Sequence, residues 1–365
     1  MNIFVINTGS TSTKLAYFQD GKVVALREHQ HPREELARLG RVINQIDFRM
    51  AVIRDAIGKS GIDVSSMDAV AGRGGLLHPL DGGVYEVSYD MLNDLHTARY
   101  GEHACNLGAV LAHELAQEWS VPAFIVDPVV TDELEDVARL TGVPGIERRS
   151  LFHALNQRGA ARTVAARLGV EYEESNFIVC HMGGGISIGA HRLGRVVDVT
   201  NALDGEGPFS PERTGGLPVI PVLEMISRGE TTPEQLKNVI LRGGGLFAHM
   251  GSNDLRETVA RMESGQDRAR LVFEALAYNI AKHIASMVPA LVDENGVFAV
   301  AAVVLTGGMA QSPVLIDEIT RLIRYVGPVE VVVGEEEMIA LAHGAERVLN
   351  GVESAHHYHA IRKSP

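Results

Sequence analysis

The sequence predicts an α/β protein made of two related domains, each a mixed sheet flanked by helices, and two glycine-rich turns are the main evidence. Residues 7–14 form one turn after the apolar run 3–6, and residues 181–187 form the other after the apolar run 177–180. Another apolar run follows each turn, so both segments predict a strand, a turn and a second strand. Since one such unit opens each half of the chain, the sequence predicts a duplicated domain.

The composition of the two turns suits the binding of phosphate. Glycine lets backbone N–H groups converge on an oxyanion, and hydroxyl groups add further donors. A single match of this kind is more often a polar hairpin, but its recurrence in both halves favours a phosphate site. The candidate contacts are Asn7, Ser10, Ser12 and Lys14 in the first turn, and His181, Gly183, Gly184 and Gly185 in the second.

The first turn is not a Walker A loop. Such a loop has a Gly-Lys-Ser/Thr sequence that enters a helix. Here Thr13 precedes Lys14, and Leu15 begins another apolar run that leads to an Asp20-Gly21 hairpin turn.

A third glycine turn differs from the other two because a helix is expected to follow it. The apolar run 303–305 leads into Gly307, Gly308 and Ala310. Backbone amides at the N-terminus of a helix bind anions well, so these residues are candidate nucleotide contacts. Three such turns resemble the pattern of the sugar kinase, Hsp70 and actin superfamily. That resemblance implies two domains of the ribonuclease H type with an ATP cleft between them.

Size and charge narrow the possible functions. The 365 residues suit two domains better than one, and the net charge of −13 without a basic stripe argues against a nucleic-acid or membrane surface. The chain enters a strand at its start, and its apolar runs are shorter than the roughly 20 residues that span a bilayer, so we expect a cytoplasmic protein. Only Cys105 and Cys180 occur, which favours neither a disulfide framework nor a zinc site.

The order of the expected elements suggests where the domains divide. We expect helices at 33–40, 42–59 and 102–118 and strands at 68–71, 84–88 and 123–126, and then a helix at 154–168 that Gly169 ends. Further helices are expected at 219–228, 233–241, 254–264, 267–292 and 336–350. We therefore expect an N-terminal domain of residues 1–150 plus about 340–365, on the side of the acyl substrate and phosphate, and a nucleotide-binding domain of residues 151–339. The histidines at 356, 357 and 359 are expected to lie in a solvated tail.

Longer strings of residues point to one family within the superfamily. They lie at 7–14, 66–79, 101–104, 126–130, 150–157, 181–188 and 201–213. Together they resemble the butyrate kinases of the acetokinase family, from residue 3 to about 350. The three glycines 183–185 and the loop 204–209 depart from the acetate kinase pattern and favour butyrate kinases.

The resemblance implies a reversible reaction in which ATP and butyrate give ADP and butyryl phosphate, with Mg²⁺ as cofactor and a homo-oligomeric enzyme. Another short or branched carboxylate remains a possible substrate, because one methylene changes discrimination by only about 10- to 200-fold. Two other functions stay open. One is an ATP sensor without catalysis, and the other is a kinase for hydroxyl groups that uses Asp127 as its base.

The resemblance also implies the catalytic residues, which are Arg73, Asp127, His153 and Arg213. Guanidinium groups match both a carboxylate and a phosphoryl group, and a histidine can donate to a phosphoryl oxygen. A carboxylate acceptor needs no general base, so Asp127 is expected to organise Mg²⁺-bound water or Arg73. The structural alternatives are surface ion pairs for the arginines, a core role for the histidine and a cap of the turn before Pro128 for Asp127.

The metal and adenosine contacts follow from the same resemblance. Asn7 and Glu337 are expected to contact Mg²⁺, which prefers oxygen ligands, with Glu335 and Glu336 as alternatives to Glu337. The run of glutamates also suits the N-terminus of a helix. Asp254 and Arg256 are expected near the adenosine, although Asp254 can equally cap the next helix.

Overall fold

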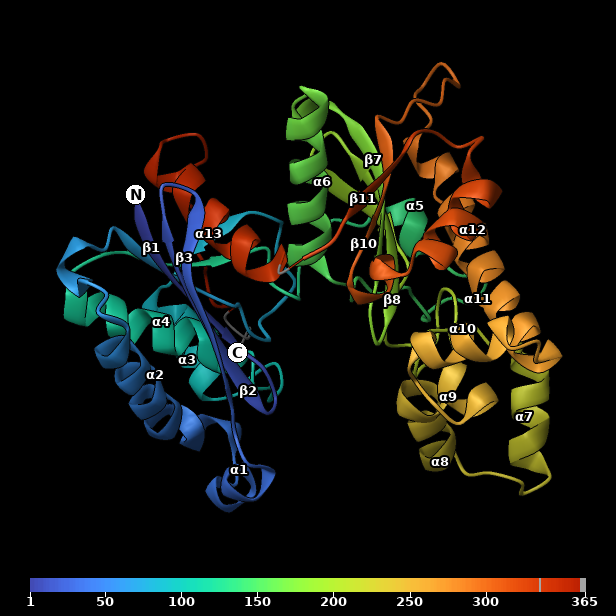
Figure 1. The fold of residues 1–365 in the computed structure, drawn as a ribbon, viewed down its shortest axis with the longest axis horizontal. Coiled ribbons are helices and arrows are strands. Elements are labelled where there is room, and N and C mark those ends of the chain that lie inside the picture. Colours follow the sequence, from blue (N-terminus) through green and yellow to red (C-terminus); the bar gives the residue numbers. More distant parts are fainter. Residues whose placement is uncertain (335, 362–365) are drawn as a thin grey trace. The chain divides into compact units, whose positions relative to one another are not determined.

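The computed structural model describes residues 1–334 and 336–361, which form two compact units (Figure 1). Unit 1 consists of Met1–Thr131 and Glu335–Pro365, and unit 2 consists of Asp132–Gly334. The domain boundary expected near residue 150 therefore falls inside unit 2.

Unit 1 contains a mixed sheet of six strands in the order β3-β2-β1-β4-β6-β5. The N-terminal strands form an antiparallel meander, whereas β4 and β6 run parallel to β1. The strands are β1 (Asn2–Thr8), β2 (Ser12–Gln19), β3 (Lys22–Gln30), β4 (Ala69–Gly72), β5 (Val84–Glu86) and β6 (Ala123–Val126).

Helices cover both faces of this sheet because β1 is apolar on both sides. Phe4 and Ile6 pack with residues of α2, α3 and α4, whereas α13 lies against β1, β4 and β6 on the other face (Figure 1). α3 was not expected; it begins where Ser88 accepts a hydrogen bond from the backbone N–H of Met91. The helices are α1 (Arg33–Leu39), α2 (Ile46–Ser60), α3 (Tyr89–His96), α4 (Asn106–Trp119) and α13 (Glu336–Leu349).

The sheet of unit 2 repeats that of unit 1. Its order is β11-β10-β7-β8-β9, with β7, β8 and β9 antiparallel and β10 and β11 parallel to β7. Both sheets have an irregular register where the second strand pairs with the third. The strands are β7 (Asn176–Met182), β8 (Ile186–Arg192), β9 (Arg195–Val199), β10 (Ala302–Thr306) and β11 (Val329–Val332). The expected fold class of two related α/β domains is confirmed.

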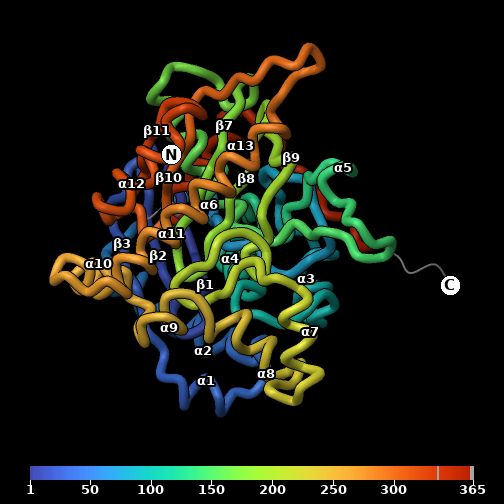
Figure 2. The backbone as a smooth tube through the Cα atoms, turned by 90° about the vertical axis from the view of Figure 1, so that its right-hand side faces the viewer, coloured from blue at the N-terminus to red at the C-terminus, as the bar shows by residue number. Residues whose placement is uncertain are grey.

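Alternating side chains of β7 build the two cores of unit 2. Ile178 and Cys180 pack toward α11 and α12, and Phe177 and Val179 pack toward α6. Both views place α7, α8 and α9 together, away from α6 (Figure 1, Figure 2). The helices are α5 (Asp136–Arg139), α6 (Ala154–Leu168), α7 (Val219–Ser227), α8 (Pro233–Asn238), α9 (Gly245–Met250), α10 (Leu255–Glu263), α11 (Asp267–Ser286) and α12 (Pro313–Ile323).

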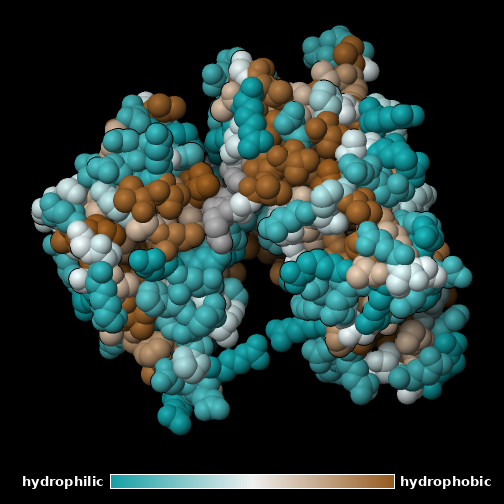
Figure 3. All heavy atoms as spheres, in the orientation of Figure 1, coloured by the Kyte–Doolittle hydropathy of each residue, from teal (hydrophilic) through white to brown (hydrophobic). Residues whose placement is uncertain are grey.

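The surface carries no continuous apolar band on the face that Figure 3 shows; hydrophilic residues lie between the hydrophobic ones on both units. Within residues 1–334 and 336–361, none of the helices combines the length and the apolar composition that crossing a bilayer requires.

The C-terminal tail is docked onto unit 1, contrary to the expectation of a solvated tail. Tyr358 is only 2% exposed, its hydroxyl donates to Asp94 Oδ2 at 2.7 Å, and its ring stacks on His78. The backbone of His356 bridges to β5, the edge strand of the sheet. The histidine side chains at 356, 357 and 359 are exposed, as expected, so Tyr358 and the backbone hold the tail.

We expect Tyr358→Ala to lower the free energy of unfolding of unit 1 by about 3 kcal/mol or more, because it removes a buried ring and a partner of the buried Asp94. His357→Ala, an exposed neighbour, should change it by less than about 0.5 kcal/mol. The single tryptophan, Trp119, lies on α4 of unit 1, so its fluorescence during urea unfolding measures this unit. Equal stabilities of the two variants would mean that the tail is not docked.

Candidate active site

Three of the expected site residues form a cluster at the carboxyl edge of the unit 1 sheet. Because Ile6 of β1 pairs with Gly72 of the parallel β4, Asn7 and Arg73 leave the sheet side by side. Arg73 Nη1 donates to Asn7 Oδ1 at 3.3 Å, and Asn7 Nδ2 donates to Glu337 Oε2 at 2.5 Å. The Arg73 guanidinium is also 3.5 Å from the Glu337 carboxylate.

This cluster brings together the two expected Mg²⁺ contacts, Asn7 and Glu337. Amide and carboxylate oxygens are the ligands that Mg²⁺ prefers, and it keeps several waters, so two protein ligands fit this ion. Across the described residues, no three His, Cys, Asp or Glu side chains form a denser metal site. Of the two alternatives, Glu335 lies outside the described residues, and nothing is described of the Glu336 side chain.

Asp127 follows β6 and binds the backbone of the neighbouring loop. Its Oδ1 accepts from Gly83 N–H at 2.8 Å, and its own N–H donates to Gly83 O at 2.9 Å. Asp127 is 3% exposed and has a φ of 40°, which is uncommon for a residue other than glycine. These contacts join Asp127 to the loop at Gly83, which is a different structural role from a cap of the turn before Pro128, and the catalytic role of Asp127 remains a proposal.

Arg49 of α2 donates hydrogen bonds to the backbone of the first glycine turn. Gly9 N–H donates to Ser12 O at 2.9 Å and so closes the turn. The Arg49 side chain is fully buried and donates to the carbonyl oxygens of Gly9, Ser10 and Ser12. It also donates to Thr13 Oγ1 and Gln45 Oε1, which are both neutral.

Burial lowers the pKa of Arg49 to about 10, which leaves it protonated at neutral pH. No sequence motif marked this residue as part of the site. Its spacing from Ile46 and Ile53 places it on the buried face of the expected helix, and that spacing is the signal that could have found it. Arg49 thus holds a positive charge beneath a turn that is expected to bind phosphate.

The second glycine turn carries two stacked histidines. His181 lies near the end of β7, and His153 immediately precedes α6. Their ring centroids are 4.2 Å apart and their planes differ by 27°. His153 Nδ1 is 2.8 Å from the hydroxyl of Ser187 on β8, and Gly183 N–H donates to Gly185 O. The structure therefore brings together both expected histidines and the expected glycines.

Arg213 lies directly against this turn. A Cβ on Gly185 would overlap Arg213 Nη1, so only glycine leaves room for the guanidinium. Nη1 donates to Ala202 O at 2.6 Å, and Nε is buried without an acceptor among the described residues. Burial is the main cause of a lowered Arg213 pKa, Glu212 opposes it and Arg242 adds to it. Ser210 joins the Arg213 loop to the turn by donating to Gly184 O at 2.7 Å.

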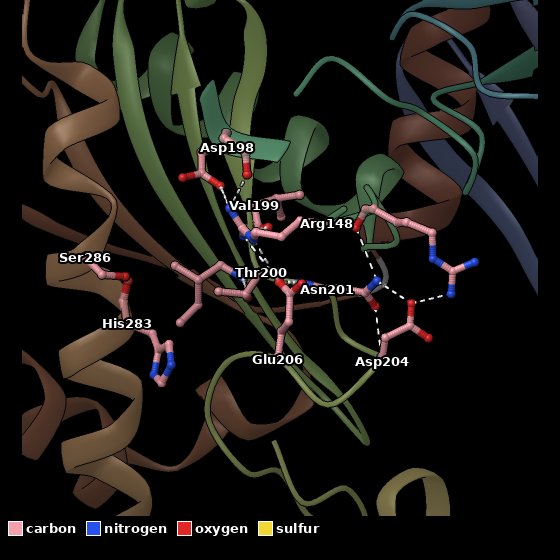
Figure 4. Close-up of polar contacts among 12 residues, drawn as sticks. Arg148, Asp198, Val199, Thr200, Asn201, Asp204, Glu206, His283 and Ser286 are labelled. Carbon is pink, nitrogen blue, oxygen red and sulfur yellow. Dashed lines mark hydrogen bonds and ion pairs between the residues drawn. The ribbon is translucent and has the colours of Figure 1, made fainter. Parts of the chain in front are cut away.

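Charged residues that the sequence analysis missed fasten the loop 201–206 that precedes Arg213 (Figure 4). Arg148 donates to Asp198 Oδ1 at 2.8 Å and to Glu206 Oε2 at 3.3 Å. Asn201 donates to Asp204 Oδ2 at 2.8 Å, and Arg149 pairs with the same carboxylate. The two ion pairs join the loop to the segment before α6.

The third glycine turn lies next to the second because β10 pairs with β7 in parallel, with Thr306 opposite His181. Gly307 has a φ of 91°, and a Cβ there would come within 2.5 Å of Met182 O. Gly308 begins a short helical turn that contains the buried Ala310. The three candidates Gly307, Gly308 and Ala310 therefore lie together beside the histidine turn.

Asp254 and Arg256 lie at the start of α10 and bind each other. Asp254 Oδ1 accepts from the backbone N–H of Arg256, which makes Asp254 the N-cap of this helix. The Arg256 guanidinium pairs with the same carboxylate at 2.6 Å and lowers the Asp254 pKa. The structure thus bears out the capping alternative, and contact with adenosine remains a proposal.

Comparisons with known proteins agree with this geometry. The model of the acetokinase family matches residues 139–362. A protein of Maridesulfovibrio salexigens named probable butyrate kinase is 51% identical over 98% of this chain and 99% of its own length. The chain belongs to the acetokinase family. A protein of Listeria monocytogenes with the same name is 44% identical over 98% of this chain and 99% of its own length.

Solved structures support the fold. An acetate kinase from Porphyromonas gingivalis has a TM-score of 0.73 at 19% identity and covers 94% of this chain and 99% of its own. A propionate kinase from Francisella tularensis has a TM-score of 0.70 at 17% identity, covering 93% and 98%. The family and the fold class expected from the motifs are therefore confirmed.

We expect Arg49→Met to lower the free energy of unfolding of unit 1 by about 3 kcal/mol or more, since three part-buried carbonyl oxygens and the buried Thr13 and Gln45 side chains lose their donor. Arg54→Met is the matched control, because Arg54 lies on the same helix but is exposed, and its guanidinium pairs with the partly exposed Glu118. Its effect should stay within about 0.5 kcal/mol. Trp119 fluorescence in urea compares them, and equal losses would contradict the supporting role of Arg49.

We expect Gly185→Ala and Gly184→Ala to affect the stability of unit 2 differently, although the two positions are adjacent. The first forces the Arg213 guanidinium out of its position and should destabilise unit 2 by about 1–3 kcal/mol. The second adds a Cβ that meets no described atom within 4 Å and should be neutral or slightly stabilising. Thermal unfolding followed by circular dichroism measures both, and a neutral Gly185→Ala would show that Arg213 does not depend on this contact.

Proposed function

We propose that this member of the acetokinase family catalyses the reversible transfer of a phosphoryl group from ATP to butyrate, giving ADP and butyryl phosphate. The observation that carries the proposal is the group formed by Arg213, His153 and His181 on the second glycine turn. A guanidinium beside imidazoles on a turn of amides offers several donors to an oxyanion. Relatives named probable butyrate kinase, at 44% to 51% identity over nearly the whole chain, favour butyrate as the acid.

Phosphoryl transfer requires positioning and charge neutralisation more than covalent help from the protein. A carboxylate is already a nucleophile, so no residue has to remove a proton from it. Arg73 and Arg213 would bind the carboxylate or the transferring group, because a guanidinium fork matches both. His153 would donate to a phosphoryl oxygen, and His181 would contact phosphate or orient its turn. Asp127 would hold the loop at Gly83 in place.

Asn7 and Glu337 would hold Mg²⁺, because the cluster offers an amide oxygen and a carboxylate. When bound, the ion neutralises charge on phosphate oxygens. Arg73 already contacts both residues, so the same cluster combines a fixed cation with the metal ligands.

The glycine turns would bind the phosphates of the nucleotide. Ser10 lies on the first turn, and Ser12 and Lys14 lie at the start of β2, directly after it. The amides of residues 183–185 belong to the second turn, and those of Gly307, Gly308 and Ala310 belong to the third. Asp254 and Arg256 would contact the adenosine. In this division unit 2 binds the nucleotide, and unit 1 contributes phosphate and acyl contacts.

We also propose that the enzyme is a cytoplasmic homo-oligomer. The exposed apolar residues of α7 favour association between copies of the chain. The side chains of Val219 and Ile220 are 68% and 64% exposed, and that of Leu223 is 52% exposed. Exposed apolar side chains grouped on one helix are typical of an interface. Light scattering of the purified chain measures the number of subunits.

We expect the chain to form acyl phosphate from ATP, Mg²⁺ and straight or branched acids of two to six carbons, with butyrate or a close neighbour preferred. Hydroxamate trapping detects the product, and ADP release with glycerol and glucose tests hydroxyl acceptors. Arg213→Ala should lower turnover by about 100-fold or more while nucleotide binding survives. Arg228→Ala, which removes an exposed arginine of the same unit, is the control.

The other outcomes separate the rival functions. ATP binding without carboxylate turnover would favour a sensor. Turnover with glycerol or glucose alone would favour a hydroxyl kinase, and Asp127→Asn should then remove most of the rate. Full activity of Arg213→Ala would remove Arg213 from the mechanism.

A further inference from the structure

A chain of buried hydrogen bonds runs from His153 into the core of unit 2. The hydroxyl of Ser187 is 2.8 Å from His153 Nδ1 and 2.8 Å from Gln157 Nε2. Gln157 Oε1 is 3.0 Å from His191 Nε2, and His191 Nδ1 is 2.9 Å from the Tyr172 hydroxyl. Ser187, Gln157 and His191 are 0% exposed, so bulk solvent does not compete for these hydrogen bonds.

The amide of Gln157 sets the direction of these bonds. Its Nε2 also lies 3.1 Å from the backbone carbonyl oxygen of Ser187, which can only accept. The NH₂ group must therefore be on this side, and its two protons go to the Ser187 carbonyl and the Ser187 hydroxyl. Oε1 is then the acceptor for His191, so His191 carries its proton on Nε2.

The bonds of His191 and Tyr172, at the end of the series away from His153, are consistent with this direction of donation. Burial and the charges of Arg158 and Arg162 lower the pKa of His191 well below its usual value, so the ring is neutral. A neutral imidazole protonated on Nε2 has a bare Nδ1, which accepts from the Tyr172 hydroxyl. Each donor between Gln157 and Tyr172 thus meets one acceptor.

The Ser187 hydroxyl determines which ring nitrogen of His153 carries the proton. The Ser187 hydroxyl already accepts from Gln157 Nε2, and its own proton needs an acceptor. Among the described residues, His153 Nδ1 is the acceptor that the structure gives it. A bare Nδ1 leaves the single proton of a neutral imidazole on Nε2.

We propose that Ser187 and Gln157 are positioning residues that hold His153 as the neutral tautomer with its proton on Nε2, ready to donate to the transferring phosphoryl group. The inference rests on the proposed function for the role of His153, but the tautomer follows from the hydrogen bonds alone. Fixing the donor in advance removes the need to reorient the ring or move a proton during transfer. The same tautomer makes His153 unsuited to act as a base through Nε2.

The tautomer can be measured on the full wild-type chain, with one variant used only to assign the signal. Two-bond ¹H–¹⁵N spectra of protein labelled in the histidine rings distinguish the two neutral tautomers, and His153→Gln identifies the signal of His153 by its loss. We expect the wild type at neutral pH to show His153 with the proton on Nε2. A proton on Nδ1, or a fully protonated ring, would overturn the proposal.

Variants then test the positioning role. Ser187→Ala should give a mixture of His153 tautomers and lower kcat by about 10- to 100-fold, with the KM for ATP changed by less than about twofold. Ser187→Cys keeps the shape with a weaker donor and should be intermediate. Tyr172→Phe is the matched control, since it removes a buried hydroxyl at the far end of the same chain. It should leave the His153 tautomer and kcat within about twofold of the wild type.

The outcomes separate this inference from the proposed function. A shifted tautomer in Ser187→Ala with unchanged kcat would overturn the positioning role. An equal loss of kcat in Tyr172→Phe would also overturn it, because general loosening of the core would then explain the effect. A wild-type chain without carboxylate turnover would refute the proposed function, and the spectra would still decide the tautomer.

Discussion

The parallel pairing of a central strand with a strand far along the chain fixes the position of most candidate site residues. Because β1 pairs with β4, Asn7 and Arg73 lie next to each other at the carboxyl edge of the unit 1 sheet. Because β7 pairs with β10, His181 and Gly307 lie next to each other at the corresponding edge of the unit 2 sheet. Carboxyl ends of parallel strands share an edge, and ligands in open α/β sheets bind there. A shift in either register would separate the residues of each cluster.

The two units use different side chains to donate hydrogen bonds to the carbonyl groups of their glycine turns. A glycine turn leaves carbonyl groups at the sheet edge that need donors. In unit 1 the donor is the buried guanidinium of Arg49, which comes from a helix and carries a charge. In unit 2 the hydroxyl of Ser210 donates to the turn at Gly184 O, and the Arg213 guanidinium lies against Gly185. The repeated topology therefore supports two turns with different chemistry.

The sequence predicted most of the elements because their signals are local. α6 begins and ends as expected, since Gly169 adopts the left-handed conformation that ends it. α11 stops at Ser286, before residue 292, because Pro289 lies in a separate short helical turn. The contact between Asn7 and Glu337 spans 330 residues, so only the family resemblance pointed to it. Ser187 and Gln157 lie in the family strings and Arg49 does not, but no role was predicted for any of the three, because a single polar residue in an expected helix or strand does not show which way it faces.

The placement of the chain's segments has a consequence for synthesis on the ribosome. Unit 2 is one continuous stretch, whereas unit 1 needs α13 and the docked Tyr358 in addition to its first 131 residues. Unit 2 can thus complete its sheet during translation. The N-terminal strands of unit 1 are covered on one face only after α13 has been synthesised. Until then one apolar face of that sheet is a surface that chaperones can bind.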